Sequence, residues 1–386
     1  MKIFVSGFLS VLLLTSCVLS MAAGALGTEK KDDALEAFSN VSASSFFLMD
    51  GFTGSCLSQR NCDISLPMAS TTKMMTCIVA LEQASLSDLV EIPKEAVGVE
   101  GSSVYLKQGE CLTVEELLFA LMLESANDAA VAIALHVSES IDDFALLMNE
   151  KAKSLGMKST NFRNPHGLPC EGHYSSARDL CKLLAYGMQN EAFRVFVGTG
   201  KTTISAPDSG KRFLSNHNKL LRIYDPCVGG KTGFTKEAGR CLVTAAEKNG
   251  RILICATLGD PNDWIDHVAL FDYGFSLFQE RKILSPFEIN HTVAVIGGVK
   301  EQVQIQNLNE FSIHLRDGEN VFWHIEAPSF IYSEIRKGEA IGSVVLTLER
   351  KEIARFELVS AEDISKREEK LSFWQKIKQI IGMWIN

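Results

Sequence analysis

The stretch PMASTTKMMTC, residues 67–77, places a serine and a lysine three positions apart, directly before an apolar run. Residues at i and i+3 share one face of a helix, so Ser70 and Lys73 are predicted to lie within reach of each other. Burial disfavours the charged form of a lysine, and a neutral amine can take a proton from a hydroxyl. The stretch therefore indicates either a nucleophile with its base or an ordinary N-capping serine beside a solvated lysine.

A second short motif lies in LESAND, inside a long apolar stretch with helical propensity. It supplies Ser125 and Asn127, and polar residues that interrupt an apolar helix either cap a kink or face a cleft. Ser159 and Asn161 repeat the same Ser-x-Asn spacing further on. The spacing alone leaves both pairs open.

A third motif, GGKTGFT, supplies Lys231, Thr232 and Gly233 on a predicted strand. A glycine in a strand lets a ligand approach the backbone closely, and the lysine adds a positive charge. A turn at the edge of a strand with a solvated lysine is the ordinary alternative for an isolated tripeptide of this kind.

The order Ser-x-x-Lys, Ser-x-Asn, Lys-Thr-Gly is the signature of penicillin-binding proteins and class A β-lactamases. Here it closely resembles that of the low-molecular-mass penicillin-binding proteins, which are serine-type D-alanyl-D-alanine carboxypeptidases. Longer segments look like the family in its order, among them GSSVYLKQGECLTVEELLFALMLESANDAAVAIA, SNHNKLL and GGKTGFTKEAGRCLVTAA. The resemblance is strong over roughly residues 46–274 and loose beyond them.

The resemblance implies an α/β (α+β) fold of the penicillin-binding and β-lactamase type. A mainly antiparallel sheet flanked by helices would stand beside a helical lobe, with the site in the cleft between them. In the family the second motif is followed by Asp-Ala-Ala, which selects Ser125 and Asn127 over the later pair.

The resemblance also implies the catalytic roles. Ser70 would attack the carbonyl of the penultimate D-alanine of a peptidoglycan stem pentapeptide and become the acyl-enzyme. Lys73 would take its proton, which needs a largely neutral amine. Ser125 would relay a proton to the leaving D-alanine, and β-lactams would inhibit by acylating the same serine.

The remaining implied residues bind the substrate. Asn127 would orient the lysine base and hold a substrate amide, while Lys231 and Thr232 would receive the terminal carboxylate. Gly233 would admit the ligand, and the backbone N–H groups of Ser70 and Phe234 would form the oxyanion hole. The resemblance implies no metal and no cofactor.

Two departures from the family pattern concern binding. Many relatives carry an arginine in the segment that corresponds to LGDPNDWIDH, and this segment has none. We therefore expect carboxylate recognition to rest more on Lys231 and Thr232. His166 of NPHGL recurs in the family, and we interpret it as a residue that packs the loop.

Two other functions compete with this interpretation. A β-lactamase-like hydrolase needs fast deacylation, usually by a glutamate in a Glu-x-x-Leu-Asn string. No such string lies between Ser125 and Lys231, and NFRNPHGL holds no acid. A non-catalytic cell-wall-binding homologue would be free to lose motif residues, and this chain retains them.

The patterns divide the 386 residues into four segments. Residues 1–25 have the order of a secretory signal peptide, so we expect an exported protein on the periplasmic side of the bacterial cytoplasmic membrane. Lipidation of Cys17 in LTSC is an alternative. Residues 36–282 form the expected catalytic domain, and short β-type runs at 285–364 predict a small all-β domain.

Residues 366–386 predict an amphipathic helix that lies on a membrane surface. Phe373, Ile377, Ile381 and Trp384 fall on one helical face, with lysines elsewhere around it. A helix that packs on the body of the protein is the alternative.

Composition excludes two further classes. A net charge of -9 and the lack of a basic stripe argue against a nucleic-acid partner. The nine cysteines after the signal form no Cys-x-x-Cys pair, which argues against a zinc site. Export permits disulfides, and the spacing assigns no pairing.

Overall fold

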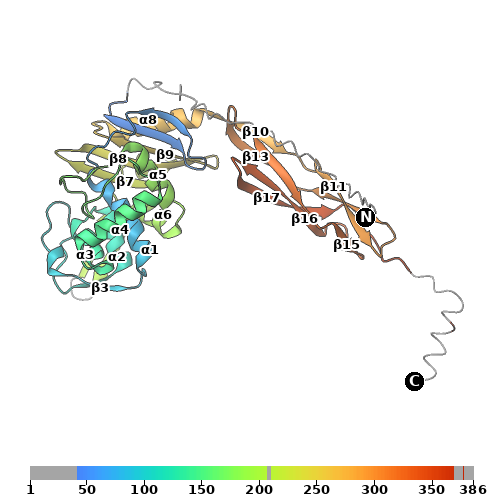
Figure 1. Ribbon diagram of the computed structural model, residues 1–386, viewed down its shortest axis with the longest axis horizontal. Coiled ribbons are helices and arrows are strands. Elements are labelled where there is room, and N and C mark those ends of the chain that lie inside the picture. Colours follow the sequence, from blue (N-terminus) through green and yellow to red (C-terminus); the bar gives the residue numbers. More distant parts are fainter. Residues whose placement is uncertain (1–40, 207–209, 369–376, 378–386) are drawn as a thin grey trace, which may run out of the picture. The chain divides into compact units, whose positions relative to one another are not determined.

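The computed structural model describes residues 41–206 and 210–368, together with residue 377 (Figure 1). The expected signal peptide at 1–25 lies outside these residues, as do residues 36–40 of the expected catalytic domain. All but residues 366–368 and 377 of the expected tail helix lies outside them too.

A five-stranded antiparallel sheet organises the first part of the chain, in the order β2-β1-β9-β8-β7. Asn249 and Gly250, both with positive φ, close the predicted hairpin between β8 and β9. Strand β7, which carries the Lys-Thr-Gly motif, ends the sheet, so none of the described strands pairs with its outer edge. The strands are β1 (Ser45–Asp50), β2 (Cys56–Arg60), β7 (Cys227–Thr235), β8 (Gly239–Lys248) and β9 (Arg251–Leu258).

Helices α5 (Ala177–Gly187) and α8 (Asp263–Ser276) cover this sheet (Figure 1). Strand β1 shows how, because its alternate side chains enter different hydrophobic clusters. Phe47 belongs to the cluster that contains residues of α5, whereas Phe46 belongs to the cluster that contains residues of α8. The two helices therefore pack on opposite faces, which agrees with the expected mixed α/β fold.

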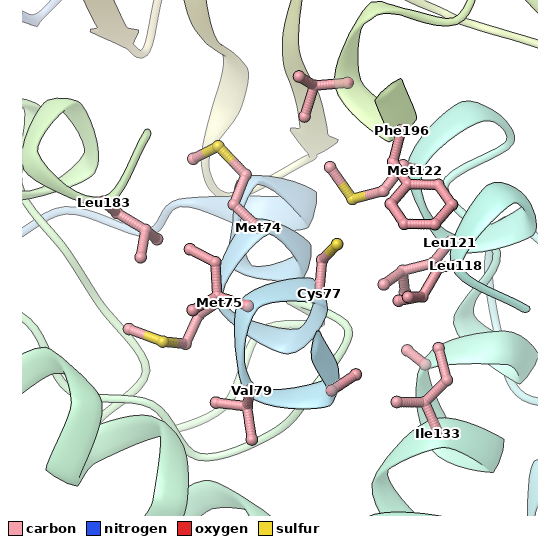
Figure 2. Close-up of a cluster of buried hydrophobic side chains, with 14 of the residues drawn as sticks. Met74, Met75, Cys77, Val79, Leu118, Leu121, Met122, Ile133, Leu183 and Phe196 are labelled. Carbon is pink, nitrogen blue, oxygen red and sulfur yellow. The ribbon is translucent and has the colours of Figure 1, made fainter. Parts of the chain in front are cut away.

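The helical lobe is built around α1 (Lys73–Gln83), which a single 3-10 turn, η1 (Ala69–Thr72), introduces. Figure 2 shows Met74, Met75, Cys77 and Val79 of α1 among side chains from the neighbouring helices. A helix that is apolar around its circumference occupies the centre of a core. The surrounding helices are α2 (Val114–Leu123), α3 (Asn127–Val137), α4 (Ile141–Ser154) and α6 (Glu191–Gly198), and a short α7 (Leu220–Ile223) follows.

The lobe also contains two small antiparallel ladders and a second 3-10 turn, η2 (Lys94–Ala96). Strand β3 (Leu89–Glu91) pairs with β4 (Cys111–Thr113), and β5 (Lys201–Ala206) pairs with β6 (Gly210–Ser215). Thr113 caps α2 with Glu116 in the predicted capping box. The long apolar stretch is not one helix, because it breaks at residues 124–126 between α2 and α3.

The predicted β-type runs after residue 285 form strands with a hydrophobic cluster of their own. Six strands make one sheet, in the order β14-β16-β17-β12-β11-β15, and β10 pairs with β13. The strands are β10 (Phe278–Leu284), β11 (Asn290–Ile296), β12 (Gln302–Asn307), β13 (Phe311–Arg316), β14 (Val321–Glu326), β15 (Phe330–Tyr332), β16 (Ala340–Leu348) and β17 (Lys351–Ser360).

Candidate active site

Ser70 and Lys73 lie where the 3-10 turn passes into α1. The Nζ atom of Lys73 is 3.0 Å from the Oγ atom of Ser70. Ser70 is half-buried, whereas Lys73 is fully buried. The residue before the serine, Ala69, has a φ of 47°, an unfavourable conformation for alanine. The predicted pair is therefore in contact, at a strained entry to a buried helix.

Two more acceptors hold the amine of Lys73. Its Nζ donates to Oδ1 of Asn127 at 2.6 Å and to the carbonyl oxygen of His166 at 2.6 Å. Burial, and after it the positive charge of Lys231, lower the pKa of Lys73 well below its usual value, while Asp128 acts in the opposite direction. The environment thus favours the neutral amine that a proton acceptor requires.

A second hydroxyl and a second amine face the first pair. The Nζ atom of Lys231, on β7, donates to Oγ of Ser125 at 3.1 Å and to the carbonyl oxygen of Thr232 at 3.0 Å. Burial lowers the pKa of Lys231 to about 7. Ser125 lies in the break between α2 and α3 with a φ of 59°. The break in the apolar stretch therefore turns this serine toward the lysine of the sheet.

Asn127 uses both ends of its amide inside the protein. While Oδ1 accepts from Lys73, Nδ2 donates to the carbonyl oxygen of Glu100 at 2.5 Å. The side chain is therefore fixed, which suits the expected orienting role. The competing pair lies elsewhere: the backbone N–H of Ser159 bonds Asp179, and Nδ2 of Asn161 bonds the carbonyl oxygen of Gly172.

Two glycines allow backbones to close around the serine. A Cβ on Gly167, whose φ is +91°, would lie 2.0 Å from the carbonyl oxygen of Ala69. A Cβ on Gly233 of β7 would lie 3.0 Å from the backbone nitrogen of Ser70. The loop after Asn164 and the strand β7 therefore lie close against the turn that carries Ser70, which requires glycine at 167 and leaves little room for a side chain at 233.

His166 contributes through its backbone and packs with its ring. Its carbonyl oxygen accepts from Lys73, and its Nδ1 accepts from the backbone N–H of Leu168 at 3.1 Å. Burial lowers the pKa of His166 to about 3, so the ring is neutral. The carbonyl contact with Lys73 has no signature in the sequence.

These groups open on a cleft of about 500 Å³. Ser70, Ser125, Thr232, Gly233 and Phe234 of the predicted set line it. Sequence reasoning missed the functional relevance of several other lining residues, although SNHNKLL was part of the family resemblance. These are Ser102, Ser215, Asn216, His217, Lys219, Arg222, Arg240, Asp263 and Trp264.

Known proteins are similar to this chain in sequence and in fold. Residues 30–262 match the family model described as D-alanyl-D-alanine carboxypeptidase. The chain is 32% identical to D-alanyl-D-alanine carboxypeptidase DacF of Bacillus subtilis, over 97% of this chain and 98% of that protein. It is 29% identical to D-alanyl-D-alanine carboxypeptidase DacC of Escherichia coli, over 90% of this chain and 91% of that protein.

A solved structure gives the same result. Penicillin binding protein 5 of Haemophilus influenzae superposes with a TM-score of 0.59 at 29% identity, over 84% of this chain and 98% of that one. The pair of Ser70 and buried Lys73 thus lies in a fold already known from penicillin-binding proteins. The chain belongs to the D-alanyl-D-alanine carboxypeptidase family of serine hydrolases.

Proposed function

We propose that the protein is a serine-type carboxypeptidase that removes the terminal D-alanine from peptidoglycan stem pentapeptides and is inhibited by penicillin. The observation that carries the proposal is the 3.0 Å contact between Ser70 Oγ and the buried amine of Lys73. Ser70 attacks the carbonyl of the penultimate D-alanine, and its proton passes to Lys73.

Collapse of the tetrahedral intermediate breaks the C–N bond and releases D-alanine. The leaving nitrogen takes a proton, for which Ser125 is the relay, supported by its contact with Lys231. Water then hydrolyses the ester, which frees Ser70. Backbone N–H groups of Ser70 and Phe234 stabilise the oxyanion, a role that the approach of β7 to the serine turn supports.

The rival β-lactamase function has less support. Class A β-lactamases deacylate fast with the help of a glutamate near the ester. Among the described residues that line the cleft, Asp263 is the only acid, and its carboxylate pairs with Arg240. In the loop beside Lys73, the group that contacts the amine is the backbone carbonyl of His166 and not an acidic side chain. We therefore expect slow release of bound penicillin.

A test of the chemistry uses Ser70→Ala and two readouts. We expect the variant to lose both release of D-alanine from a pentapeptide and covalent labelling by a fluorescent penicillin, because both need the same ester. Ser159→Ala, which changes the unused Ser-x-Asn copy, is the control and should keep both activities. Wild-type labelling of the Ser70→Ala protein would show that another residue is the nucleophile.

The second part of the proposal concerns domains and location. Residues 1–25 direct export, residues 36–282 form the catalytic domain and residues 285–364 form a small β domain. Residues 366–386 attach the protein peripherally to the membrane. No described helix is long and apolar enough to cross a membrane. Each apolar side chain of the tail face contributes on the order of 1.5–3 kcal/mol when fully buried, and each lysine near anionic headgroups about 1 kcal/mol.

Truncation after Ser365 tests this attachment. We expect the shortened protein to leave the membrane fraction and to hydrolyse a soluble peptide at the normal rate, because the motif residues precede Gly274. The full-length protein in the same cells is the control. If the truncated form still sedimented with membranes after a high-salt wash, the tail would not be the anchor, and a lipid on Cys17 would become the explanation to test.

A further inference from the structure

We propose that Arg240 binds the terminal carboxylate of the substrate, with Asp263 and Trp264 holding its guanidinium in place. This inference rests on the proposed function, because it concerns the residue that leaves during the same reaction. It changes the expectation that carboxylate recognition falls to Lys231 and Thr232 without an arginine.

The register of the sheet pairs Arg240 with Phe234, and both residues line the cleft. Arg240 on β8 lies directly opposite Phe234 on the edge strand β7, and residues so paired project from the same face of a sheet. Thr232 lies two residues before Phe234 and therefore faces the same way. All three line the cleft together with Ser70. A carboxylate next to the bond attacked by Ser70 would thus meet the hydroxyl of Thr232 and the guanidinium of Arg240.

The guanidinium is oriented before any ligand arrives. Its Nη2 atom donates to both carboxylate oxygens of Asp263, at 2.8 Å each. Its Cζ atom lies 5.3 Å from the centre of the Trp264 ring. The Asp263 side chain is 3% exposed, whereas that of Arg240 is 41% exposed, so the arginine is the partner that faces the cleft.

Some N–H groups of the Arg240 guanidinium make no hydrogen bond with the described residues. Its Nε atom is buried and has no hydrogen-bond partner in the part of the chain that the structure describes. The ion pair uses Nη2 alone, and Nη1 makes no hydrogen bond with any of the described residues. The planar guanidinium is held on one side by the carboxylate of Asp263 and on its face by the ring of Trp264. Its remaining N–H groups can bind a second carboxylate.

The charge of the cleft favours the same ligand. Lys231 is buried and donates hydrogen bonds to Ser125 and Thr232. Its pKa is lowered to about 7, so at neutral pH it is cationic only part of the time. An arginine stays charged at any pH the protein meets. Lys219 and Arg222 also line the cleft, so Asp263, the one acid among the described lining residues, does not cancel the positive charge of the cleft.

The test compares two forms of one peptide, ending in D-alanyl-D-alanine with a free carboxylate or with a terminal amide. We expect Arg240→Gln to raise KM and to lower kcat/KM for the free acid by roughly 10- to 100-fold, the loss of a charge-assisted hydrogen bond. Turnover of the amide should change little. Arg240→Lys, which keeps the charge and loses the fork, should fall between. Arg194→Gln, at an exposed position on α6, is the control.

The positioning role of Asp263 predicts a smaller effect. Asp263→Asn should raise KM for the free acid and leave kcat close to normal, because the guanidinium loses its fixed orientation and not its charge. The double variant Arg240→Gln/Asp263→Asn leaves no buried carboxylate unpaired, so it separates a folding defect from a binding defect. It should show the same loss of preference for the free acid as Arg240→Gln.

If Arg240→Gln lowered kcat/KM for the acid and for the amide by the same factor, the inference would be overturned. If the wild-type protein turned over neither peptide, the proposed function would fail, and acylation by penicillin and by its methyl ester would replace the two substrates. In that case a wild-type preference for the free carboxylate that disappears in Arg240→Gln still supports the inference. A preference that persists in the variant contradicts it.

Discussion

The catalytic region, residues 41–276, and the β-strand region, residues 278–360, differ in whether they bury amines without an acidic partner. The core of the β-strand region is aliphatic, and its one buried ionisable side chain, Glu319, is ion-paired. The catalytic region buries two lysines, Lys73 and Lys231, whose amines contact hydroxyl and carbonyl oxygens and no carboxylate of the described residues. Burial of an amine is costly and shifts its pKa. The difference indicates where stability is given up for chemistry.

Backbone strain differs in the same way. In the β-strand region the non-glycine residues with positive φ, among the described residues, are Phe287, Glu349 and Arg350, in the connections between strands. In the catalytic region two such residues, Ala69 and Ser125, adjoin or belong to the two hydroxyl–amine pairs. Strain at a turn alone is ordinary; strain beside buried amines marks a site.

The largest expected effect comes from substitution of Lys73, the buried base, and concerns the rate of acylation. Lys73→Arg keeps a positive charge and removes the base, since a guanidinium stays protonated near neutral pH. We expect acylation by penicillin to slow by roughly 10²- to 10⁴-fold, the usual contribution of a general base. Stopped-flow labelling measures the rate, and a thermal melt checks the fold. Acylation near the wild-type rate would rule out proton abstraction by this lysine.

The next effect compares two glycines of similar conformation. Gly167, with a φ of +91°, lies against Ala69, and Gly318 in the β-strand region, with a φ of +87°, has nothing within 4 Å of its Cβ position. Alanine costs roughly 1–2 kcal/mol of strain at either site. At Gly167 it must also displace the serine turn, so we expect acylation to fall by roughly 10²-fold.

Gly318→Ala should acylate normally, because only stability is affected. Penicillin labelling and urea unfolding of both variants separate the two contributions. Equal acylation rates would mean that the close contact at Gly167 does not position Ser70.

A smaller effect concerns acid stability. Burial lowers the pKa of His166 to about 3, of His173 to about 4 and of His267 to about 3. Below about pH 6.5 the histidines of the unfolded chain are protonated, whereas the buried rings of the folded protein stay neutral. Each histidine should therefore lower the free energy of unfolding by up to roughly 1.4 kcal/mol per unit of decreasing pH. Asp260, with its pKa raised to about 6, acts in the opposite direction. Burial also raises the pKa of Asp263, so three imidazoles stand against two carboxyls and leave a net loss.

Thiols report this loss for the catalytic region alone, because the sequence has no cysteine after Cys255. Cys77, Cys181 and Cys255 are fully buried, so a short methanethiosulfonate pulse labels them only on unfolding. Urea midpoints at pH 7.5 and 5 give the comparison. A midpoint that did not move would show that the buried histidines do not set the acid limit.

Local patterns in the sequence predicted the parts that depend on near neighbours. These include the contact of Ser70 with Lys73, one turn apart, and the capping box at Thr113. Features that depend on distant segments escaped prediction. Ser125 contacts Lys231 across the cleft, and Arg240 lies at the cleft through the pairing of β8 with β7.

The central claim is that Ser70 is activated by a neutral Lys73, and the pH dependence of its acylation tests this most directly. The acylation rate constant for penicillin should fall with decreasing pH as Lys73 gains a proton, with a midpoint well below the usual lysine value of about 10.4. Lys231→Gln should move this midpoint to higher pH, because the charge of Lys231 lowers the pKa of Lys73. A wild-type midpoint near 10.4, or one that Lys231→Gln leaves in place, would contradict the account.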